Sequence, residues 1–218
     1  MRISIVGAGM IGGTLARLFV RRGHEVLLAN STGPDTLADI AAELGPDLYP
    51  ATVENAARGS DLVVLAIPLG GYRTLPADAF TGRIVVDATN YYQARDGAIA
   101  ELEAGTITSS QLIATRLMGA LVVKAFNTLA YTLLRDESRV GLPMQDRLAI
   151  PLAGDDPFAK RTVAALIEDI GFAPVDAGML ADGRLQQPGT PVYNLPTNAG
   201  RLQALLAERA RARGWLGE

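Results

Sequence analysis

Short, uninterrupted apolar runs recur along the first part of the chain, and stretches with helical spacing follow the first two of them. The runs are Arg2–Val6, Glu25–Ala29, Asp61–Ile67, Arg83–Ala88 and Ala120–Phe126. Runs of this length without polar alternation are typical of strands that are buried on both faces, as in a parallel sheet. Strands that alternate with helices predict an α/β fold of the Rossmann type, with a doubly wound and mainly parallel sheet.

Two helices are expected between the early strands. Apolar residues recur every three or four positions over Met10–Arg22, and Gly23 provides a stop. Pro34 suits the first turn of a second helix, which continues to Gly45. The order strand, helix, strand, helix is that of a mononucleotide-binding half of a doubly wound sheet.

The regular pattern stops after Asn127. Residues 128–148 show no clear period, so we place a boundary there, between a Rossmann domain at 1–127 and a smaller C-terminal region at 128–218. The later elements expected are a strand at Ala149–Ala153, a helix at Phe158–Ile170 with Asp156 as its N-cap, a strand at Phe172–Val175, a loop at 184–194 and a terminal helix at 200–213.

The first strand runs directly into a glycine motif. Gly7, Gly9 and Gly12 match G-x-G-x-x-G, with Ala8, Met10 and Ile11 between them. The first glycine permits a tight turn, the second lets the backbone approach a pyrophosphate, and the third lets the helix pack on the strand. The phosphates would lie at the positive end of the helix. The alternative is that the glycines serve only a tight turn.

The end of the second strand bears on the choice of cofactor. An acidic residue that binds the ribose of NAD is expected there, but the chain has Asn30, Ser31 and Thr32. No carboxylate would repel a 2′-phosphate, and these side chains can donate hydrogen bonds, so we predict NADP rather than NAD. The loop holds no Arg or Lys, which is the commoner device. The alternative is that Ser31 or Thr32 only caps the next helix.

Ligands of an open parallel sheet bind beyond the carboxyl ends of its strands. The residues expected around the nicotinamide are therefore Ala66, Ile67, Pro68, Thr89 and Asn90. The polar groups among them could orient an amide or a ring carbonyl, or could simply satisfy loop backbone.

No catalytic residue is identified, although Lys124, Asn127 and Tyr91 are candidates. Lys124 could bind an oxyanion or donate a proton, or could be a solvated edge residue. Tyr91, like its neighbour Tyr92, could supply a phenolic proton or a stacking surface, or could pack a loop. Asp87 lies in an apolar run and more readily anchors backbone N–H groups than acts as a base.

Composition removes several classes of chemistry. The single histidine, His24, lies in the turn before the second strand, away from the strand ends, and there is no cysteine. A Ser-His-Asp or Cys-His arrangement and a metal cluster are therefore not expected. Few ionisable groups around a nicotinamide suit hydride transfer between two ring systems, where the cofactors carry the reactivity.

Charge and hydropathy set expectations for partners and location. Hydrophobic residues make up 49% and charged residues 20%, with a net charge of −3, as expected for a globular protein without a basic surface for nucleic acid. No apolar run approaches the roughly 20 residues that cross a bilayer. We therefore expect no nucleic-acid or membrane partner and a cytoplasmic location.

Several segments together resemble a known family. They are "RISIVGAGMIGGTLARLFVRRGHEV", "VVLAIP", "VVDATN", "VVKAFNT" and "LAGDDPFAKRTVAALIEDIGFAPVDAG". In this order they resemble the NADP-dependent oxidoreductases of coenzyme F420, a deazaflavin, over residues 1–180. The chain is similar in the same way to the NADPH domain of membrane metalloreductases.

The resemblance implies a Rossmann domain and hydride transfer between NADP(H) and a deazaflavin or flavin. It implies that Ala8–Ile11 and Asn30–Thr32 contact NADP, that Ile67 and Pro68 lie near the nicotinamide, and that Asn127, Leu129 and Ala130 border the second ring. Members of the family often form homodimers. A dimer is also plausible from apolar residues at 186–196 and in the terminal helix.

Two other functions remain open. One is an NADPH-dependent reductase of a small carbonyl, imine or enone substrate, with Lys124, Tyr91 or Tyr92 as proton donor. The other is an NADP(H)-binding sensor without catalysis.

Overall fold

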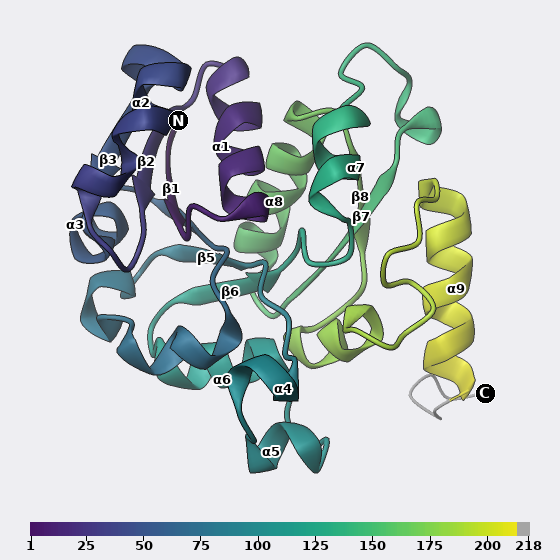
Figure 1. The fold of residues 1–218 in the computed structure, drawn as a ribbon. Helices are drawn as coiled ribbons and strands as arrows, with labels where there is room; N and C mark the ends of the chain where they lie inside the picture. The colour runs from purple at the N-terminus through teal and green to yellow at the C-terminus, as the bar shows by residue number, and fades with distance from the viewer. Residues whose placement is uncertain (213–218) are drawn as a thin grey trace.

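A single twisted sheet of eight strands forms the centre of the protein in the computed structural model, which describes residues 1–212 (Figure 1). The strands are β1 Arg2–Val6, β2 Glu25–Ala29, β3 Leu48–Ala51, β4 Leu62–Leu65, β5 Ile84–Asp87, β6 Leu121–Lys124, β7 Ala149–Gly154 and β8 Ala173–Asp176. Their order across the sheet is β3-β2-β1-β4-β5-β6-β7-β8. The first six run parallel, and β7 and β8 run in the opposite direction. The predicted doubly wound, mainly parallel fold is confirmed.

Helices cover both faces of this sheet. The α-helices are α1 Met10–Arg21, α2 Ala38–Leu44, α3 Val53–Arg58, α4 Gln93–Asp96, α5 Ala100–Glu103, α6 Ser109–Arg116, α7 Tyr131–Asp136, α8 Pro157–Asp169 and α9 Ala199–Ala212. Two cores result, because successive strand residues point to opposite faces. Val64 belongs to the core that includes residues of α1, α7 and α8, whereas its neighbours Val63 and Leu65 belong to the core that includes residues of α3 and α6.

The register of the parallel strands aligns their carboxyl ends. Val6 pairs with Ala29 on one side and Leu65 on the other, Leu65 pairs with Asp87, and Asp87 pairs with Lys124. The chain reverses its progress across the sheet at β1, whose neighbours are β2 and β4. A crevice at such a reversal is where open α/β sheets bind ligands.

Three parts of the chain differ from the sequence prediction or add to it. Residues 128–148, which show no clear period in the sequence, contain helix α7, which begins at Tyr131 and packs on α1 through Leu134. Residues 184–194 are not wholly a loop, because a 3-10 helix at Leu180–Gln186 overlaps their start. The predicted helix from Pro34 is a 3-10 turn at Pro34–Leu37 followed by α2.

Several short elements were missed. The strand β3 is the sheet edge and contains Pro50, so it lacks the apolar run of a buried strand. Helix α6 has a capping box of Thr108 and Gln111, a sequence signal that could have predicted its start. Helices α3, α4 and α5 are only four to six residues long, too short for a periodic pattern.

The boundary after Asn127 stays a prediction. The sheet continues across it, because β6 pairs with β7. The terminal helix is present as α9, and the last residue predicted for it, Arg213, lies outside the described residues. Within the described chain, no helix combines the length and the apolar character that a membrane crossing requires.

Candidate active site

The glycine loop connects β1 to α1 in a space that admits no side chain at two positions. Gly7 has φ +111°, and a Cβ there would lie 2.3 Å from the Ala66 carbonyl oxygen. A Cβ at Gly12 would lie 1.8 Å from the Gly7 carbonyl oxygen. These two glycines hold strand and helix together, as the motif predicts.

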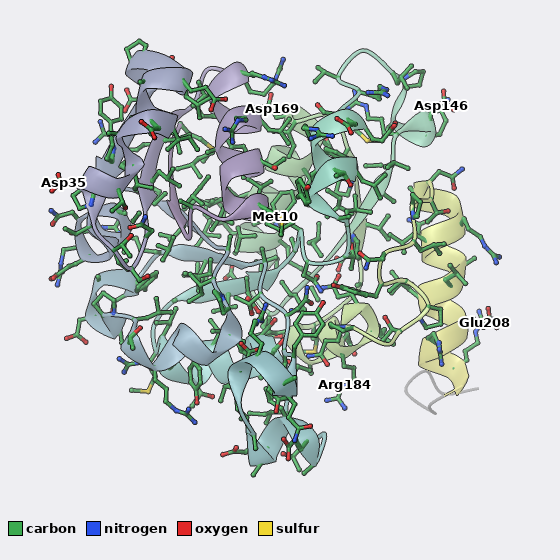
Figure 2. The ribbon with its side chains drawn as sticks, viewed as in Figure 1. Met10, Asp35, Asp146, Asp169, Arg184 and Glu208 are labelled. Carbon is green, nitrogen blue, oxygen red and sulfur yellow. The ribbon has the colours of Figure 1, made fainter. Side chains whose placement is uncertain are left out.

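Gly9 differs, because a Cβ there would meet no protein atom within 4 Å. The space in front of it therefore belongs to a cavity. Met10 begins α1, with no side-chain cap and no acidic residue in the first turn, and Figure 2 shows it at the start of this helix. The first N–H groups of a helix lack partners within it and attract anions. The loop fits the pyrophosphate of a dinucleotide.

A cavity of about 750 Å³ lies at the reversal of the sheet between β1 and β4. Its lining is Val6, Gly7, Ala8, Gly9, Asn30, Ser31, Val53, Ala66, Ile67, Pro68, Gly71, Thr74 and Leu75. Among these lining residues none is charged. The cavity joins the glycine loop to the end of β2, where the ribose and its 2′-phosphate are expected, so we call it the adenosine-side cavity.

The loop after β2 uses most of its polar groups internally. The Asn30 amide donates to Thr36 Oγ1 at 2.8 Å, and Asn30 Oδ1 accepts from the Thr32 N–H at 3.1 Å. The hydroxyls of Thr32 and Thr36 are 2.9 Å apart. Ser31 lines the cavity and makes no side-chain hydrogen bond within the described chain. Of the three side chains predicted as donors, Asn30 and Thr32 are thus engaged within the loop, whereas Ser31 is not.

A second cavity of about 500 Å³ lies beyond the ends of β4, β5 and β6, and we call it the nicotinamide-side cavity. Its lining is Met10, Ile11, Ala66, Ile67, Pro68, Ala88, Thr89, Asn90, Tyr92, Arg95, Phe126, Asn127, Leu129, Ala130, Tyr193 and Asn194. It contains the strand-end residues that the sequence predicted. Residues 66–68 line both cavities, so one extended ligand can occupy the two.

The charged side chain of the nicotinamide-side cavity, among the residues that line it, is Arg95. Its guanidinium lies 5.0 Å from the centre of the Tyr92 ring and donates to the Asn90 carbonyl at 2.7 Å. The Tyr92 and Tyr193 hydroxyls are hydrogen-bonded to each other. Burial, and then this hydrogen bond, raise the pKa of Tyr193 to about 12, which keeps its proton in place at neutral pH.

Asn127 is held rigidly at the cavity wall. Its side chain is buried, and the amide donates to Asn90 Oδ1 at 3.0 Å and to the Gln186 carbonyl at 2.7 Å. Asn127 Oδ1 and Thr89 Oγ1 are buried without a hydrogen-bond partner. The structure therefore brings Asn90 and Asn127 together as a pair of fixed amides.

Lys124 is absent from the residues that line the cavity and is fully buried, so the alternative of a solvated edge residue is wrong. Its Nζ donates to the Thr89 carbonyl at 3.1 Å and lies 3.5 Å from Asp87 Oδ2. Burial lowers the pKa of Lys124, which Asp87 partly offsets. Asp87 Oδ1 accepts the Thr89 N–H at 2.9 Å, so its predicted anchoring of backbone is confirmed.

Tyr91 also points elsewhere. Its hydroxyl oxygen lies 2.9 Å from the Gly97 carbonyl oxygen and 3.0 Å from Glu103 Oε1, either of which can accept its single proton, and it accepts the Ile99 N–H. Burial raises the pKa of Tyr91. These contacts match the alternative in which Tyr91 packs a loop. His24 lies just before the amino end of β2, contacts Asp169 at 3.0 Å and lines neither cavity.

Arg95, Tyr193 and Asn194 line the nicotinamide-side cavity but are not among the residues predicted from the sequence. The last two belong to a late segment that is tied over the cavity, because the Asn194 N–H donates to the Thr128 carbonyl at 2.8 Å. No motif marks these residues, and only the folded chain brings them beside the ends of β5 and β6.

Comparisons with known proteins give a match to one family and several similar structures. The sequence profile described as "NADP oxidoreductase coenzyme F420-dependent" matches residues 2–91. The hypothetical protein SMa0349 from Sinorhizobium meliloti is similar in structure, with 33% identity, a TM-score of 0.79, and coverage of 91% of this chain and 95% of that one.

Two further relatives are more distant or shorter matches. A candidate F420-dependent NADP reductase from Arthrobacter sp. FB24 has 24% identity and a TM-score of 0.71, with coverage of 100% of this chain and 95% of that one, which shows a shared fold. The Escherichia coli (strain K12) protein YjhV is 42% identical over 60 residues, 28% of this chain. The chain therefore spans less than half, 44%, of the length of this curated relative.

Proposed function

The chain belongs to the family of coenzyme F420-dependent NADP oxidoreductases, and we propose that it transfers a hydride between NADP(H) and a deazaflavin or flavin-like coenzyme. The observation that carries the proposal is the pair of cavities that share residues 66–68. A dinucleotide that lies across this shared wall would leave part of the nicotinamide-side cavity to a second ring.

The walls of the nicotinamide-side cavity suit stacking better than acid–base chemistry. Most of the lining residues are apolar, and Arg95 is the charged one among them. Transfer between two rings depends on their face-to-face placement, and bound NADPH supplies the hydride itself. The chain's part is to hold pyrophosphate on the N–H groups at the start of α1 and to orient polar ring substituents with Asn90 and Asn127.

A second candidate is the reduction of a small carbonyl, imine or enone substrate. The observation in its favour is the hydroxyl pair of Tyr92 and Tyr193 in the cavity wall. A phenol that keeps its proton at neutral pH could supply it to an oxygen or nitrogen that gains charge in the reaction. Tyr91 and Lys124, which do not line the cavity, are less suited to this role than Tyr92.

The homodimer, the cytoplasmic location and the lack of a nucleic-acid partner stay predictions. The apolar side of α9 gives the dimer no support, because Leu202 and Leu206 pack on Val175 of the same chain. Light scattering on the purified protein would measure the oligomeric state.

Rapid-mixing absorbance measurements with NADPH test the proposed function. We expect loss of the reduced-nicotinamide band with coenzyme F420, FMN or FAD, in the wild type and in a Tyr193→Phe variant. Turnover only with small carbonyl or imine compounds, abolished in that variant, would favour the second candidate. Binding of NADPH without oxidation by any acceptor would leave a sensor module as the function.

A further inference from the structure

The loop after β2 offers little to a 2′-phosphate by itself. Its Asn30 amide and Thr32 hydroxyl are engaged with Thr36, and the adenosine-side cavity has an uncharged lining. A phosphate carries nearly two negative charges and is bound in proteins mainly by cationic side chains and backbone N–H groups. A cation from another element is therefore worth seeking beside this cavity.

Arg17 of α1 lies near the glycine loop, because it lines a neighbouring cavity together with Ala8 and Gly9. Its Nη1 donates to the Gly13 carbonyl at 3.0 Å, so the guanidinium points back toward the start of the helix. Gly13 lies three residues after Met10, or about 4.5 Å along the helix axis. A Cβ at Gly13 would lie 3.3 Å from Arg17 Nη1, so the glycine leaves room for the guanidinium.

The guanidinium faces a third cavity of about 470 Å³, which we call the α1–α2 cavity. Its lining is Ala8, Gly9, Met10, Gly13, Thr14, Arg17, Leu18, Arg21, Ile40, Glu43, Tyr131 and Arg135. Ala8 and Gly9 also line the adenosine-side cavity, so the two cavities meet at the glycine loop. Three arginines and one glutamate give the α1–α2 cavity an excess of positive charge.

Glu43 of α2 holds Arg17 in this place. Arg17 Nε and Nη2 donate to the two carboxylate oxygens at 2.8 and 2.6 Å. The two side chains are 33% and 52% exposed, and ion pairs in such surroundings contribute roughly 0–1 kcal/mol. Little free energy is therefore lost when a phosphate replaces this carboxylate as the partner of Arg17. In addition, Nη1 and Nη2 together have two further N–H groups to donate.

We propose that Arg17 is the cationic partner of the 2′-phosphate of NADP(H), supplied by α1 in place of a basic residue in the loop after β2. The assignment rests on the NADP(H) binding of the proposed function. Arg17 would form charge-assisted hydrogen bonds to the phosphate from the glycine-loop side, and the free hydroxyl of Ser31 would meet it from the loop side. Glu43 keeps the guanidinium extended when no cofactor is bound.

Equilibrium binding of NADPH and NADH, followed by cofactor fluorescence without any acceptor, tests this role. In Arg17→Gln we expect the Kd of NADPH to rise about tenfold or more, the effect of losing a charged hydrogen-bond partner, while the Kd of NADH changes less than about twofold. Arg17→Lys should fall between, because it keeps the charge but loses the fork of donors. Arg161→Gln, an exposed position on α8, is the matched control and should change neither Kd.

The variant Glu43→Gln distinguishes a direct contact of Arg17 with the phosphate from a structural effect of its ion pair with Glu43. It breaks the same ion pair but keeps the guanidinium, so the Kd of NADPH should stay equal or fall. An equal loss of NADPH and NADH affinity in Arg17→Gln, a weakening of NADPH in Glu43→Gln like that in Arg17→Gln, or an unchanged NADPH Kd in Arg17→Gln would each overturn the assignment. Failure of both cofactors to bind the wild type would instead contradict the proposed function, and failure of flavin reduction alone would leave this result intact.

Discussion

The three glycines of the loop after β1 serve different purposes at the scale of single residues. Gly7 and Gly12 are needed by the protein itself, because a Cβ at either would overlap a backbone carbonyl. Gly9 has φ −75°, which any residue can adopt, and a Cβ there would enter empty space. We therefore infer that Gly9 lacks a side chain because a bound ligand occupies the space in front of it.

Alanine substitutions separate these two requirements. We expect Gly12→Ala to lower the free energy of unfolding by roughly 1–3 kcal/mol or more, because the helix must move off the strand. We expect Gly9→Ala to leave that free energy nearly unchanged and to raise the Kd of NADPH at least tenfold, because the methyl group fills the space of the pyrophosphate. Urea unfolding and NADPH titration on both variants measure the two quantities, and a stable Gly12→Ala protein with normal Kd would contradict this division.

At the scale of elements, a buried ion pair joins the ends of two strands to a helix. Asp87 at the end of β5 contacts Lys124 of β6 and accepts the Ser110 hydroxyl of α6 at 2.6 Å. Both charged side chains are fully buried. The pair thus fixes where β5 ends and the loop to Asn90 begins, which positions the cavity wall without lining it.

Removal of one charge should be far more damaging than removal of both. We expect Asp87→Asn to lower the free energy of unfolding by about 3–5 kcal/mol, because it leaves Lys124 buried without its counter-charge. The double variant Asp87→Leu/Lys124→Met should lose less than the sum of the single changes. Urea unfolding checks both, with Asp61→Asn as a control, since the Asp61 side chain is 93% exposed in its ion pair with Arg83 and should change little.

At the scale of the whole molecule, the late part of the chain closes the nicotinamide-side cavity. Tyr193 reaches Tyr92, the Gln186 carbonyl accepts from Asn127, and the Asn194 N–H donates to Thr128. Contacts between residues about 60 to 100 positions apart thus complete the wall.

The raised pKa of Tyr193 makes this closure visible in the pH dependence of stability. A tyrosine ionises near pH 10 in the unfolded chain but near pH 12 here, so between these values the unfolded state loses its proton first and gains stability. The contribution of Tyr193 is therefore complete below about pH 10 and declines as the pH rises toward about 12.

We expect the free energy of unfolding of the wild type, relative to Tyr193→Phe, to fall between about pH 9 and about pH 11. Urea unfolding of both proteins at the two pH values measures it. Phenolate absorbance should also show that the variant lacks one of the late-titrating tyrosines of the wild type, since the pKa of Tyr91 is raised as well. An unchanged difference between the proteins would mean that Tyr193 is not shielded as the structure indicates.

The sequence by itself determined every strand of the sheet except β3, the glycine loop and the residues at the strand ends. These are local properties: an apolar run buries itself on both faces, a G-x-G-x-x-G spacing fits one kind of turn, and a parallel sheet brings its carboxyl ends to one edge. Ala66, Ile67, Pro68, Asn90 and Asn127 could be placed near the site for this reason.

Only the tertiary structure decided which side chains face the cavities. It buried Lys124 in an ion pair and turned Tyr91 into its own loop. It also brought Arg95 and Tyr193 to the nicotinamide-side cavity, and Arg17 to the adjoining α1–α2 cavity. A side chain's direction depends on contacts with distant parts of the chain, which no local pattern of residue types records.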